Sequence, residues 1–242
     1  MKITVAGNER EFDLAAAWKI IFEILKKPNA VIGLATGKTT RNIHALISEI
    51  YKNYPFDVSK ITFFGVDEVT NVPRDYKGAC FTMLKTQLID ALSISEKNFL
   101  MPPTFSDNWE IECLNFQKMI NLRGGADFQV LGLGENGHIG FNQPGTPFDR
   151  ETWVSEMDAA LEKRIRAETA TPAEIPLGGL TLGIATIMRS QKILLVAKGA
   201  SKAEIVKKLI TGQVTTDIPA SILQLHPHCE ILLDKEAAKL LN

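Results

Sequence analysis

A histidine and three side-chain amides lie close together in a glycine-rich segment. Residues 131–148 read LGLGENGHIGFNQPGTPF and contain Asn136, His138 and Gln143. Histidine is the side chain best suited to moving protons near neutral pH. The segment follows an apolar run, and its glycines leave room for a ligand beside the imidazole. Two interpretations stay open for His138, a proton-transfer group or an exposed loop residue.

Two adjacent carboxylates end another apolar run. Residues 61–69 read ITFFGVDEV, which places Asp67 and Glu68 at the carboxyl end of an expected strand. Successive side chains point to opposite faces of a strand, so we expect the two acids to have different roles. A desolvated carboxylate can act as the base that removes a carbon-bound proton. The alternative is an acid pair that caps a helix or faces solvent in a loop.

A third polar segment suits an anion. Residues 34–43 read LATGKTTRNI, and backbone N–H groups at a helix N-terminus attract negative charge. A nucleotide P-loop would need glycine five residues before Gly37, where this chain has Ile32. The alternative is a plain turn capped by Thr39 or Thr40. The candidate phosphate-binding residues here are Thr36, Gly37, Lys38 and Thr39.

Elements of two kinds alternate along the chain and must position these segments. Runs of strand length cover 3–5, 30–36, 61–69, 127–134, 192–199 and 229–237, and helical periodicity covers about 12–27, 79–92, 108–122 and 201–212, with one further helix opening after residue 36. Strands that are apolar throughout, alternating with helices, indicate a mostly parallel central sheet with helices on both faces. The fold class expected is therefore α/β.

Ligands of such sheets bind beyond the carboxyl ends of the strands. Each of the polar segments follows an expected strand, so we expect all of them to face one crevice. No repeat or low-complexity linker divides the chain, which predicts a single domain over residues 1–242. The charged stretch 149–176, poor in strand signal and containing Pro172 and Pro176, predicts a lid.

Composition excludes several classes of function. The net charge is −1, so no basic excess is available for a general nucleic-acid binder. The chain has no 18-residue apolar run and no signal-peptide pattern, which predicts a cytoplasmic protein without a membrane partner. Its three cysteines are widely spaced, and His226 and His228 lie in a separate segment. We therefore expect neither a disulfide framework nor a metal site.

Taken together, these segments resemble the amino-sugar-6-phosphate deaminase/isomerase family over nearly the whole chain. The resemblance is carried by AVIGLATGKTT, FFGVDEV, LGLGENGHIGFNQPG, LTLGIATI, VAKGASKAEIV and ILQLHPH. Within it, the Gly-His-Ile-x-Phe-Asn-x-Pro core is highly specific. YKGAC, VLGLG and IPASILQLH lean toward the galactosamine-6-phosphate branch rather than the glucosamine-6-phosphate branch.

The resemblance implies a chemistry and roles for these residues. A 2-amino-2-deoxy-hexose 6-phosphate is ring-opened, isomerised from aldose to ketose and deaminated to a ketohexose 6-phosphate and ammonia, without metal or cofactor. Asp67 would carry the proton from C2 to C1, and His138 would handle the ring-oxygen proton. Lys202 would bind the 6-phosphate together with the loop Thr36–Thr39. Because the C2 imine is hydrolysed, the resemblance also suggests a hydrolase as well as an isomerase.

Two positions depart from the family pattern. The resemblance implies Asp two residues before His138 and Glu five residues after it, whereas this chain has Asn136 and Gln143. An amide can orient the imidazole but supplies no charge. We therefore expect an active enzyme with impaired ring opening, with Glu135 as a possible substitute carboxylate. The candidates for a further phosphate-binding cation are Lys163, Arg164 and Arg166, which equally suit a solvated helix face.

Two other functions stay open. A 6-phosphogluconolactonase would have a similar phosphate loop and Gly-His pair. Its expected Asp-Glu-Arg is Asp67-Glu68-Val69 in this chain, and its expected Thr-Ala-Ser-Leu-Phe-Pro after Gly-His is Ile-Gly-Phe-Asn-Gln-Pro here. A non-catalytic sugar-phosphate-binding homologue would keep the site without turnover, but it would need no carbon-acid base such as Asp67. The sequence does not decide between monomer and homo-oligomer, nor does it decide the C4 epimer.

Overall fold

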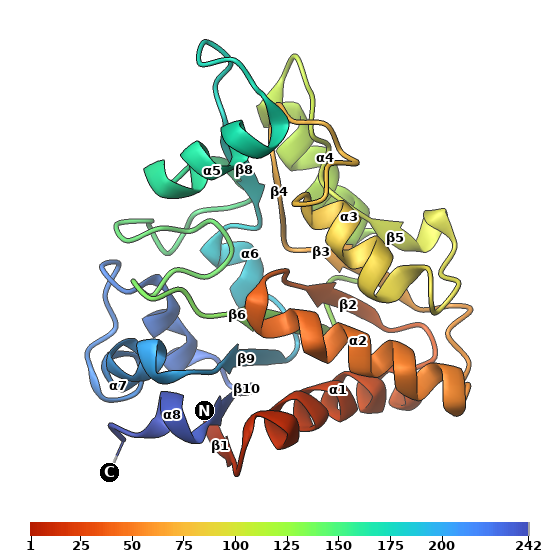
Figure 1. The fold of residues 1–242 in the computed structure, drawn as a ribbon, viewed down its shortest axis with the longest axis vertical. Helices are drawn as coiled ribbons and strands as arrows, with labels where there is room; N and C mark the ends of the chain where they lie inside the picture. The colour runs from red at the N-terminus through yellow and green to blue at the C-terminus, as the bar shows by residue number, and fades with distance from the viewer. Residues whose placement is uncertain (242) are drawn as a thin grey trace.

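The computed structural model describes residues 1–241, and a seven-stranded sheet forms its centre (Figure 1). The strand order is β1 (Lys2–Ala6), β10 (Cys229–Asp234), β9 (Ile193–Ala197), β6 (Phe128–Gly132), β2 (Val31–Leu34), β3 (Thr62–Gly65) and β5 (Phe99–Leu100). Every neighbouring pair in this sheet is parallel. The prediction of a mostly parallel α/β sheet is confirmed.

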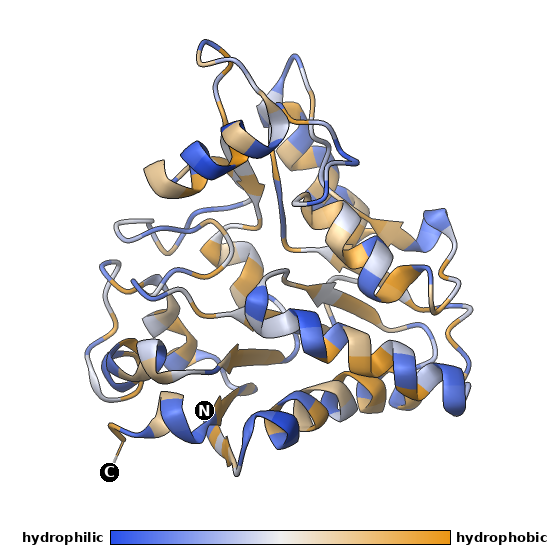
Figure 2. Cartoon of the chain, viewed as in Figure 1, coloured by the Kyte–Doolittle hydropathy of each residue, from blue (hydrophilic) through white to orange (hydrophobic). Residues whose placement is uncertain are grey.

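Helices cover both faces of the sheet because alternate strand residues point to opposite sides. In β9, Leu194 and Val196 join the core beneath α1 (Glu9–Lys26) and α2 (Lys38–Asn53). The other residues of β9 join a second core, which is covered by α4 (Trp109–Asn121), α6 (Ile184–Met188), α7 (Ala203–Thr211) and α8 (Lys235–Ala238). Figure 2 shows hydrophobic and hydrophilic residues alternating along α1 and α2, as expected for helices with one buried side.

A second, antiparallel sheet consists of β4 (Asp67–Val69), β8 (Gly178–Thr181) and β7 (Trp153–Glu156). The prediction of one strand over 61–69 is therefore wrong, since the run divides between two sheets at Val66. The Val66 N–H donates to the Leu34 carbonyl at 3.2 Å, while its own carbonyl accepts from the Leu182 N–H at 3.0 Å. Both strands are buried and only Val66 separates them, so the sequence does not show where the first strand ends.

Other predicted elements are also corrected by the structure. The helix predicted over 79–92 consists of α3 (Cys80–Leu84) and a π-helical turn, η1 (Lys85–Ile89). The strand predicted over 229–237 ends at Asp234, whose carboxylate caps α8 by accepting from the Ala237 N–H at 2.8 Å. The remaining short helical turns are η2 (Glu96–Asn98), η3 (Ala200–Lys202) and η4 (Pro219–Leu225).

The segment predicted as a strand-poor lid contains regular structure. It includes β7 and the helix α5 (Ala159–Thr169). The sequence of β7, WVSE, is short and only half apolar, which is why its strand signal is weak. Its pairing with β8 supplies the backbone hydrogen bonds that local propensity does not predict. A lid movement of residues 149–176 stays a prediction.

Candidate active site

The polar segments meet at one edge of the large sheet. Strands β9, β6 and β2 are neighbours and parallel, so their carboxyl ends lie side by side. Thr36 follows β2, the loop 133–146 follows β6, and Lys202 in η3 follows β9. The chain reverses its direction across the sheet between β2 and β6, and such switch points are where open α/β sheets bind ligands.

Asp67 is the buried carboxylate of this edge. It opens β4, and its exposed fraction is 9%. Burial raises the pKa of Asp67 to about 7; a hydrogen bond from Cys80 opposes this shift and the charge of Glu68 adds to it. A carboxylate with a pKa near 7 is ionised in part at neutral pH, the state that proton transfer in both directions requires.

Glu68 has a different role from its neighbour. Its carboxylate accepts from the backbone N–H groups of Val69, Cys80 and Phe81 at 2.9, 2.9 and 2.7 Å. Burial raises the pKa of Glu68, and these three hydrogen bonds act in the opposite direction. Glu68 therefore caps the start of α3, and the expectation that adjacent acids do different jobs agrees with this geometry.

Two amides orient His138. Asn136 Oδ1 accepts from the His138 backbone N–H at 3.2 Å, and it lies 2.7 Å from His138 Nδ1. Because a backbone N–H can only donate, the Asn136 atom beside it must be the oxygen, and Nδ1 must therefore carry a proton. In the neutral ring Nε2 is then left unprotonated. Asn136 Nδ2 in turn donates to Gln143 Oε1 at 2.9 Å, so Gln143 reaches the histidine only through Asn136.

Charges around His138 act in opposite directions. Burial and the positive charge of Lys202 lower the pKa of His138, whereas the carboxylate of Asp158 raises it. Burial also lowers the pKa of Lys202, against the nearby charge of Glu135. Asp158 is the N-cap of α5, so the segment predicted as a lid faces the imidazole with a negative charge. Glu135, the substitute carboxylate expected from the sequence, instead acts on Lys202.

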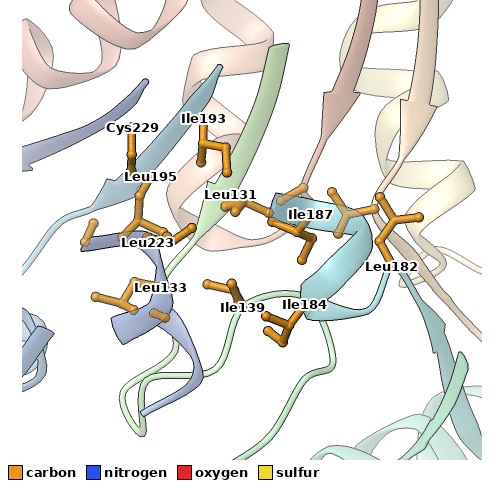
Figure 3. Close-up of a cluster of buried hydrophobic side chains, with 14 of the residues drawn as sticks. Leu131, Leu133, Ile139, Leu182, Ile184, Ile187, Ile193, Leu195, Leu223 and Cys229 are labelled. Carbon is orange, nitrogen blue, oxygen red and sulfur yellow. The ribbon is translucent and has the colours of Figure 1, made fainter. Parts of the chain in front are cut away.

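The loop that carries His138 is anchored from both sides. Ile139 is fully buried in the core shown in Figure 3, near Leu133 and Ile184. Asn142 is also fully buried, and its amide donates to the carbonyls of Ile139 and Leu182 at 2.9 and 2.8 Å. Trp153 Nε1 of β7 donates to Asn142 Oδ1 at 3.0 Å. These contacts tie the loop to the antiparallel sheet that carries Asp67.

Gly140 brings the loop against the Asp67 carboxylate. Its φ is 57°, a left-handed conformation that favours glycine. A Cβ added at this position would lie 2.6 Å from Thr181 Oγ1 and 3.5 Å from Asp67 Oδ2. Thr181 Oγ1 also accepts from the Phe141 N–H at 3.2 Å. The absence of a side chain at residue 140 therefore lets the backbone pass close beside the Asp67 carboxylate.

The start of α2 is open to an anion. Gly37 is its N-cap, with a φ of 140°, and within the described chain no side chain caps this helix end. Thr40 Oγ1 instead faces the Gly37 carbonyl at 3.4 Å, so the capping interpretation of Thr39 or Thr40 is wrong. The backbone N–H groups of the first turn and the helix dipole point to the same edge as Asp67. Thr36 and Thr39 are half-buried here, while Gly37 and Lys38 are exposed.

The cations of α5 are placed differently from one another. Arg166 donates to Glu162 and to the carbonyls of Pro172 and Ile175, so its guanidinium closes the loop that follows the helix. Lys163 and Arg164 are exposed. None of these contacts brings a cation of this helix to the start of α2.

Sequence reasoning missed Cys80, Asn142 and Trp153. Cys80 lies 3.5 Å from Asp67 Oδ1 although thirteen residues separate the two in sequence. No local sequence pattern predicts this contact, because it depends on how α3 packs against β4. Asn142 lies within the Gly-His segment, but its buried amide looks like any loop asparagine until β7 and β8 are in place.

Residues 1–241 contain neither a membrane-spanning helix nor a metal-binding cluster. No helix there is both long and apolar enough to cross a membrane. No cluster of three or more His, Cys, Asp or Glu side chains in that range is arranged to hold a metal ion. His226 is buried, and its Nε2 lies 2.9 Å from the Ser190 carbonyl, in keeping with a structural role.

The fold and site define an α/β protein in which a buried carboxylate and a histidine loop lie at the same sheet edge as an uncapped helix N-terminus. Residues 15–231 match the family model described as glucosamine-6-phosphate isomerases/6-phosphogluconolactonase. The chain belongs to this family, as the sequence resemblance predicted.

Relatives match over their full length. A Clostridium botulinum protein (strain Loch Maree / Type A3) named glucosamine-6-phosphate deaminase is 38% identical over 245 residues, covering 100% of this chain and 99% of the relative. A solved structure of a monomeric glucosamine-6-phosphate deaminase is 32% identical with a TM-score of 0.92, covering 99% of this chain and 100% of that one. The 6-phosphogluconolactonase of Trypanosoma brucei is 22% identical with a TM-score of 0.79, covering 100% and 98%, and so shares the fold.

The comparisons correct one expectation. The suggestion that this protein is a hydrolase is wrong, because the relatives at 36 to 38% identity are named deaminases. The 6-phosphogluconolactonase structure resembles the chain in fold alone. The lean toward galactosamine 6-phosphate stays a prediction, since these relatives are named for the glucosamine substrate.

Proposed function

We propose that this protein deaminates and isomerises a 2-amino-2-deoxy-hexose 6-phosphate to a ketohexose 6-phosphate and ammonia. One observation carries the proposal: Asp67 Oδ2 faces the backbone of the loop that presents His138, and burial raises the pKa of Asp67 to about 7. Abstraction of a proton bound to carbon needs such a desolvated carboxylate. The names of the full-length relatives support the same reaction.

The substrate phosphate would bind at the start of α2. The uncapped N–H groups and the helix dipole attract a dianion, and Lys202 supplies a cation from the end of β9, two strands from β2 in the sheet. Thr36 and Thr39 would add hydroxyl contacts. Phosphate affinity is remote from the reacting carbons, so it contributes binding energy that orients C1 and C2. This assignment covers Thr36, Gly37, Lys38, Thr39 and Lys202.

The proton transfers then divide between two groups. His138 Nε2 is unprotonated because Asn136 keeps the other proton on Nδ1, so it takes the proton of the C1 hydroxyl and delivers it to the ring oxygen as the bond between C1 and that oxygen breaks. Asp67 removes the C2 proton and returns it at C1, while a second proton passes from the amino group to the C1 oxygen, so that C1 becomes an alcohol and C2 an imine. Water adds there and ammonia leaves, giving the ketose. Asn136 and Gln143 act by orienting the imidazole rather than by supplying charge.

Two alternatives are less well supported. A 6-phosphogluconolactonase would release no ammonia, and the likeness to such an enzyme at 22% identity extends to fold alone. A non-catalytic binder would have no use for a carboxylate whose pKa is about 7 beside the reacting carbons. Both alternatives predict that ammonia does not form from an amino-sugar phosphate.

The test is ammonia release from glucosamine 6-phosphate and galactosamine 6-phosphate, measured side by side. We expect turnover of at least one of them, and we expect Asp67→Asn to reduce kcat at least about 100-fold. Asp107→Asn, at an exposed carboxylate, serves as the matched control and should leave kcat unchanged. Because the base must be ionised, kcat/KM should fall as the pH decreases below about 7. Intact turnover in Asp67→Asn would overturn the mechanism.

A further inference from the structure

A buried thiol lies between the base and the loop that precedes α2. Cys80 opens α3 and its exposed fraction is 5%. Its Sγ lies 3.1 Å from Thr36 Oγ1 and 3.5 Å from Asp67 Oδ1. One sulfur atom thus connects the end of β2 with the start of β4, which belong to different sheets.

The direction of these hydrogen bonds follows from proton counting. Burial and the charges of Glu68 and Asp67 raise the pKa of the Cys80 thiol, so the thiol stays protonated with a single hydrogen. An ionised Asp67 can only accept, so that hydrogen points to Oδ1. The sulfur then accepts the hydrogen of the Thr36 hydroxyl. The order is Thr36 O–H to sulfur, and S–H to carboxylate.

The second carboxylate oxygen faces the catalytic loop. A Cβ built on Gly140 would lie 3.5 Å from Asp67 Oδ2, so Oδ2 is turned toward the backbone that follows His138. With Oδ1 occupied by the thiol, Oδ2 is the oxygen presented to a substrate beside His138. The thiol contact thus holds one oxygen of the carboxylate and leaves the other turned toward the loop.

We propose that Cys80 is a positioning residue that holds the Asp67 carboxylate with Oδ2 as the proton-accepting atom and couples it to Thr36. This inference rests on the proposed function, because it assumes that Asp67 is the base. The coupling joins the residue expected to contact the phosphate to the residue expected to take the C2 proton. Binding of the phosphate at Thr36 and orientation of the base then share one hydrogen-bond chain.

A thiol in this place has a specific electrostatic consequence. It is a weak donor, so it stabilises the ionised carboxylate less than a hydroxyl would. Burial and the charge of Glu68, on the same strand, raise the pKa of Asp67. Burial also raises the pKa of Glu68, and Arg74 acts in the opposite direction. Tyr76 is near enough to Cys80 and Glu68 for their charges to add to the effect of burial in raising its pKa. Replacing the thiol with a stronger donor should lower the pKa of Asp67, and removing the donor should raise it.

The test compares Cys80→Ala with Cys80→Ser in the full-length protein. We expect the acidic limb of the kcat/KM profile to move up by about half a pH unit in Cys80→Ala and down by a similar amount in Cys80→Ser. We also expect kcat to fall more than KM changes in Cys80→Ala, since the orientation of the base is lost. Cys113→Ala and Cys229→Ala remove buried thiols outside this chain of contacts and should leave the limb unchanged.

A second measurement reports the same shifts without turnover. Titration of the Asp67 carboxyl by ¹³C NMR should move in opposite directions in the two variants. Unchanged limbs and titrations, or shifts in the same direction, would overturn the role of Cys80. Absence of ammonia from the unsubstituted protein would count against the proposed function instead, and the NMR titration would still decide the hydrogen bond.

Discussion

At the scale of single residues, the histidine is oriented by amides where the family resemblance implies carboxylates. Asn136 fixes the tautomer of His138, because its oxygen accepts both the backbone N–H and Nδ1–H. Gln143 acts one step further away by holding Asn136. Neither group carries charge, so burial and Lys202 keep the pKa of His138 low. Geometry is preserved here while the stabilisation of an imidazolium is lost.

A carboxylate introduced at Asn136 or Gln143 should therefore raise the pKa of His138 by an amount that depends on its distance from the imidazole. Asn136→Asp puts a carboxylate in contact with Nδ1 and should raise the pKa of His138 by about one unit. Gln143→Glu should raise it less, because Asn136 stands between the two side chains, and it should raise kcat modestly by favouring ring opening. Imidazole proton titrations by NMR and kcat measurements check both effects.

The control for added charge is Gln213→Glu, at an exposed position far along the chain. It should leave both the titration and kcat unchanged. A larger shift in Gln143→Glu than in Asn136→Asp would contradict the order of the hydrogen-bond chain. A decrease in kcat in Gln143→Glu would contradict the view that a missing charge impairs ring opening.

At the scale of elements, α2 is held by a buried neutral histidine. His44 is fully buried in this helix, and its Nδ1 lies 3.2 Å from Gln87 Oε1 of η1. Ser48 Oγ donates to the Gln87 carbonyl at 2.7 Å. Within residues 1–241, His44 Nε2 has no hydrogen-bond partner. Through Gln87, the π-helical turn η1 thus holds α2, the helix whose N-terminus has no side-chain cap.

His44 should make stability depend on pH. Burial lowers its pKa from 6.5 to about 4, so the unfolded chain binds a proton more readily than the folded chain between these values. Above pH 6.5 His44 is neutral in both the folded and the unfolded chain, so its titration should not change the free energy of unfolding there. It should decrease as the pH falls from 6.5 toward 4, by roughly 3 kcal/mol at most.

Chemical denaturation at several pH values measures this dependence. His44→Leu loses the bond to Gln87 and should be less stable at pH 7, but its stability should decline less between pH 6.5 and 4. His228→Gln, at an exposed histidine, should retain the decline of the unsubstituted protein. Parallel curves for His44→Leu and the unsubstituted protein would contradict the predicted shift.

At the scale of the whole molecule, the site lies where two sheets meet. The start of α2, the proposed phosphate site, follows β2 of the parallel sheet. Asp67 lies on β4 of the antiparallel sheet. Val66 joins the sheets through its backbone, and Cys80 joins them through its side chain. The loop of His138 is attached to the small sheet through Asn142 and Trp153. Under the proposed function, the relative placement of the two sheets would therefore set the distance between a bound phosphate and the Asp67 carboxylate.

Loosening this attachment should affect turnover as well as stability. Trp153→Phe removes the indole N–H and leaves Asn142 Oδ1 buried without its donor, which should cost roughly 1–3 kcal/mol in the free energy of unfolding. We expect kcat to fall several-fold, with a smaller change in KM, since the start of α2 is untouched. Trp18→Phe, at a tryptophan with an exposed fraction of 51%, is the control for both measurements. A change confined to KM would contradict this coupling.

The sequence by itself determined the class of fold and most of the groups that meet. Apolar runs of strand length are local patterns, so the parallel strands were predictable from 30–36, 127–134 and 192–199. Because the carboxyl ends of adjacent parallel strands share an edge, the loops with Thr36 and His138 could be placed together from local patterns alone. Strand alternation also predicted different roles for Asp67 and Glu68, and in the structure the two carboxylates have different partners.

Only the tertiary structure decided how these groups are connected. The break at Val66 is not visible in local patterns, since β3 and β4 are both buried and only one residue separates them. The contact of Cys80 with Asp67, like that of Trp153 with Asn142, joins segments that local periodicity treats as independent. Hydrogen-bond partners across such distances are set by packing of whole elements. For this reason the chemistry of the site was readable in the sequence, whereas its geometry was not.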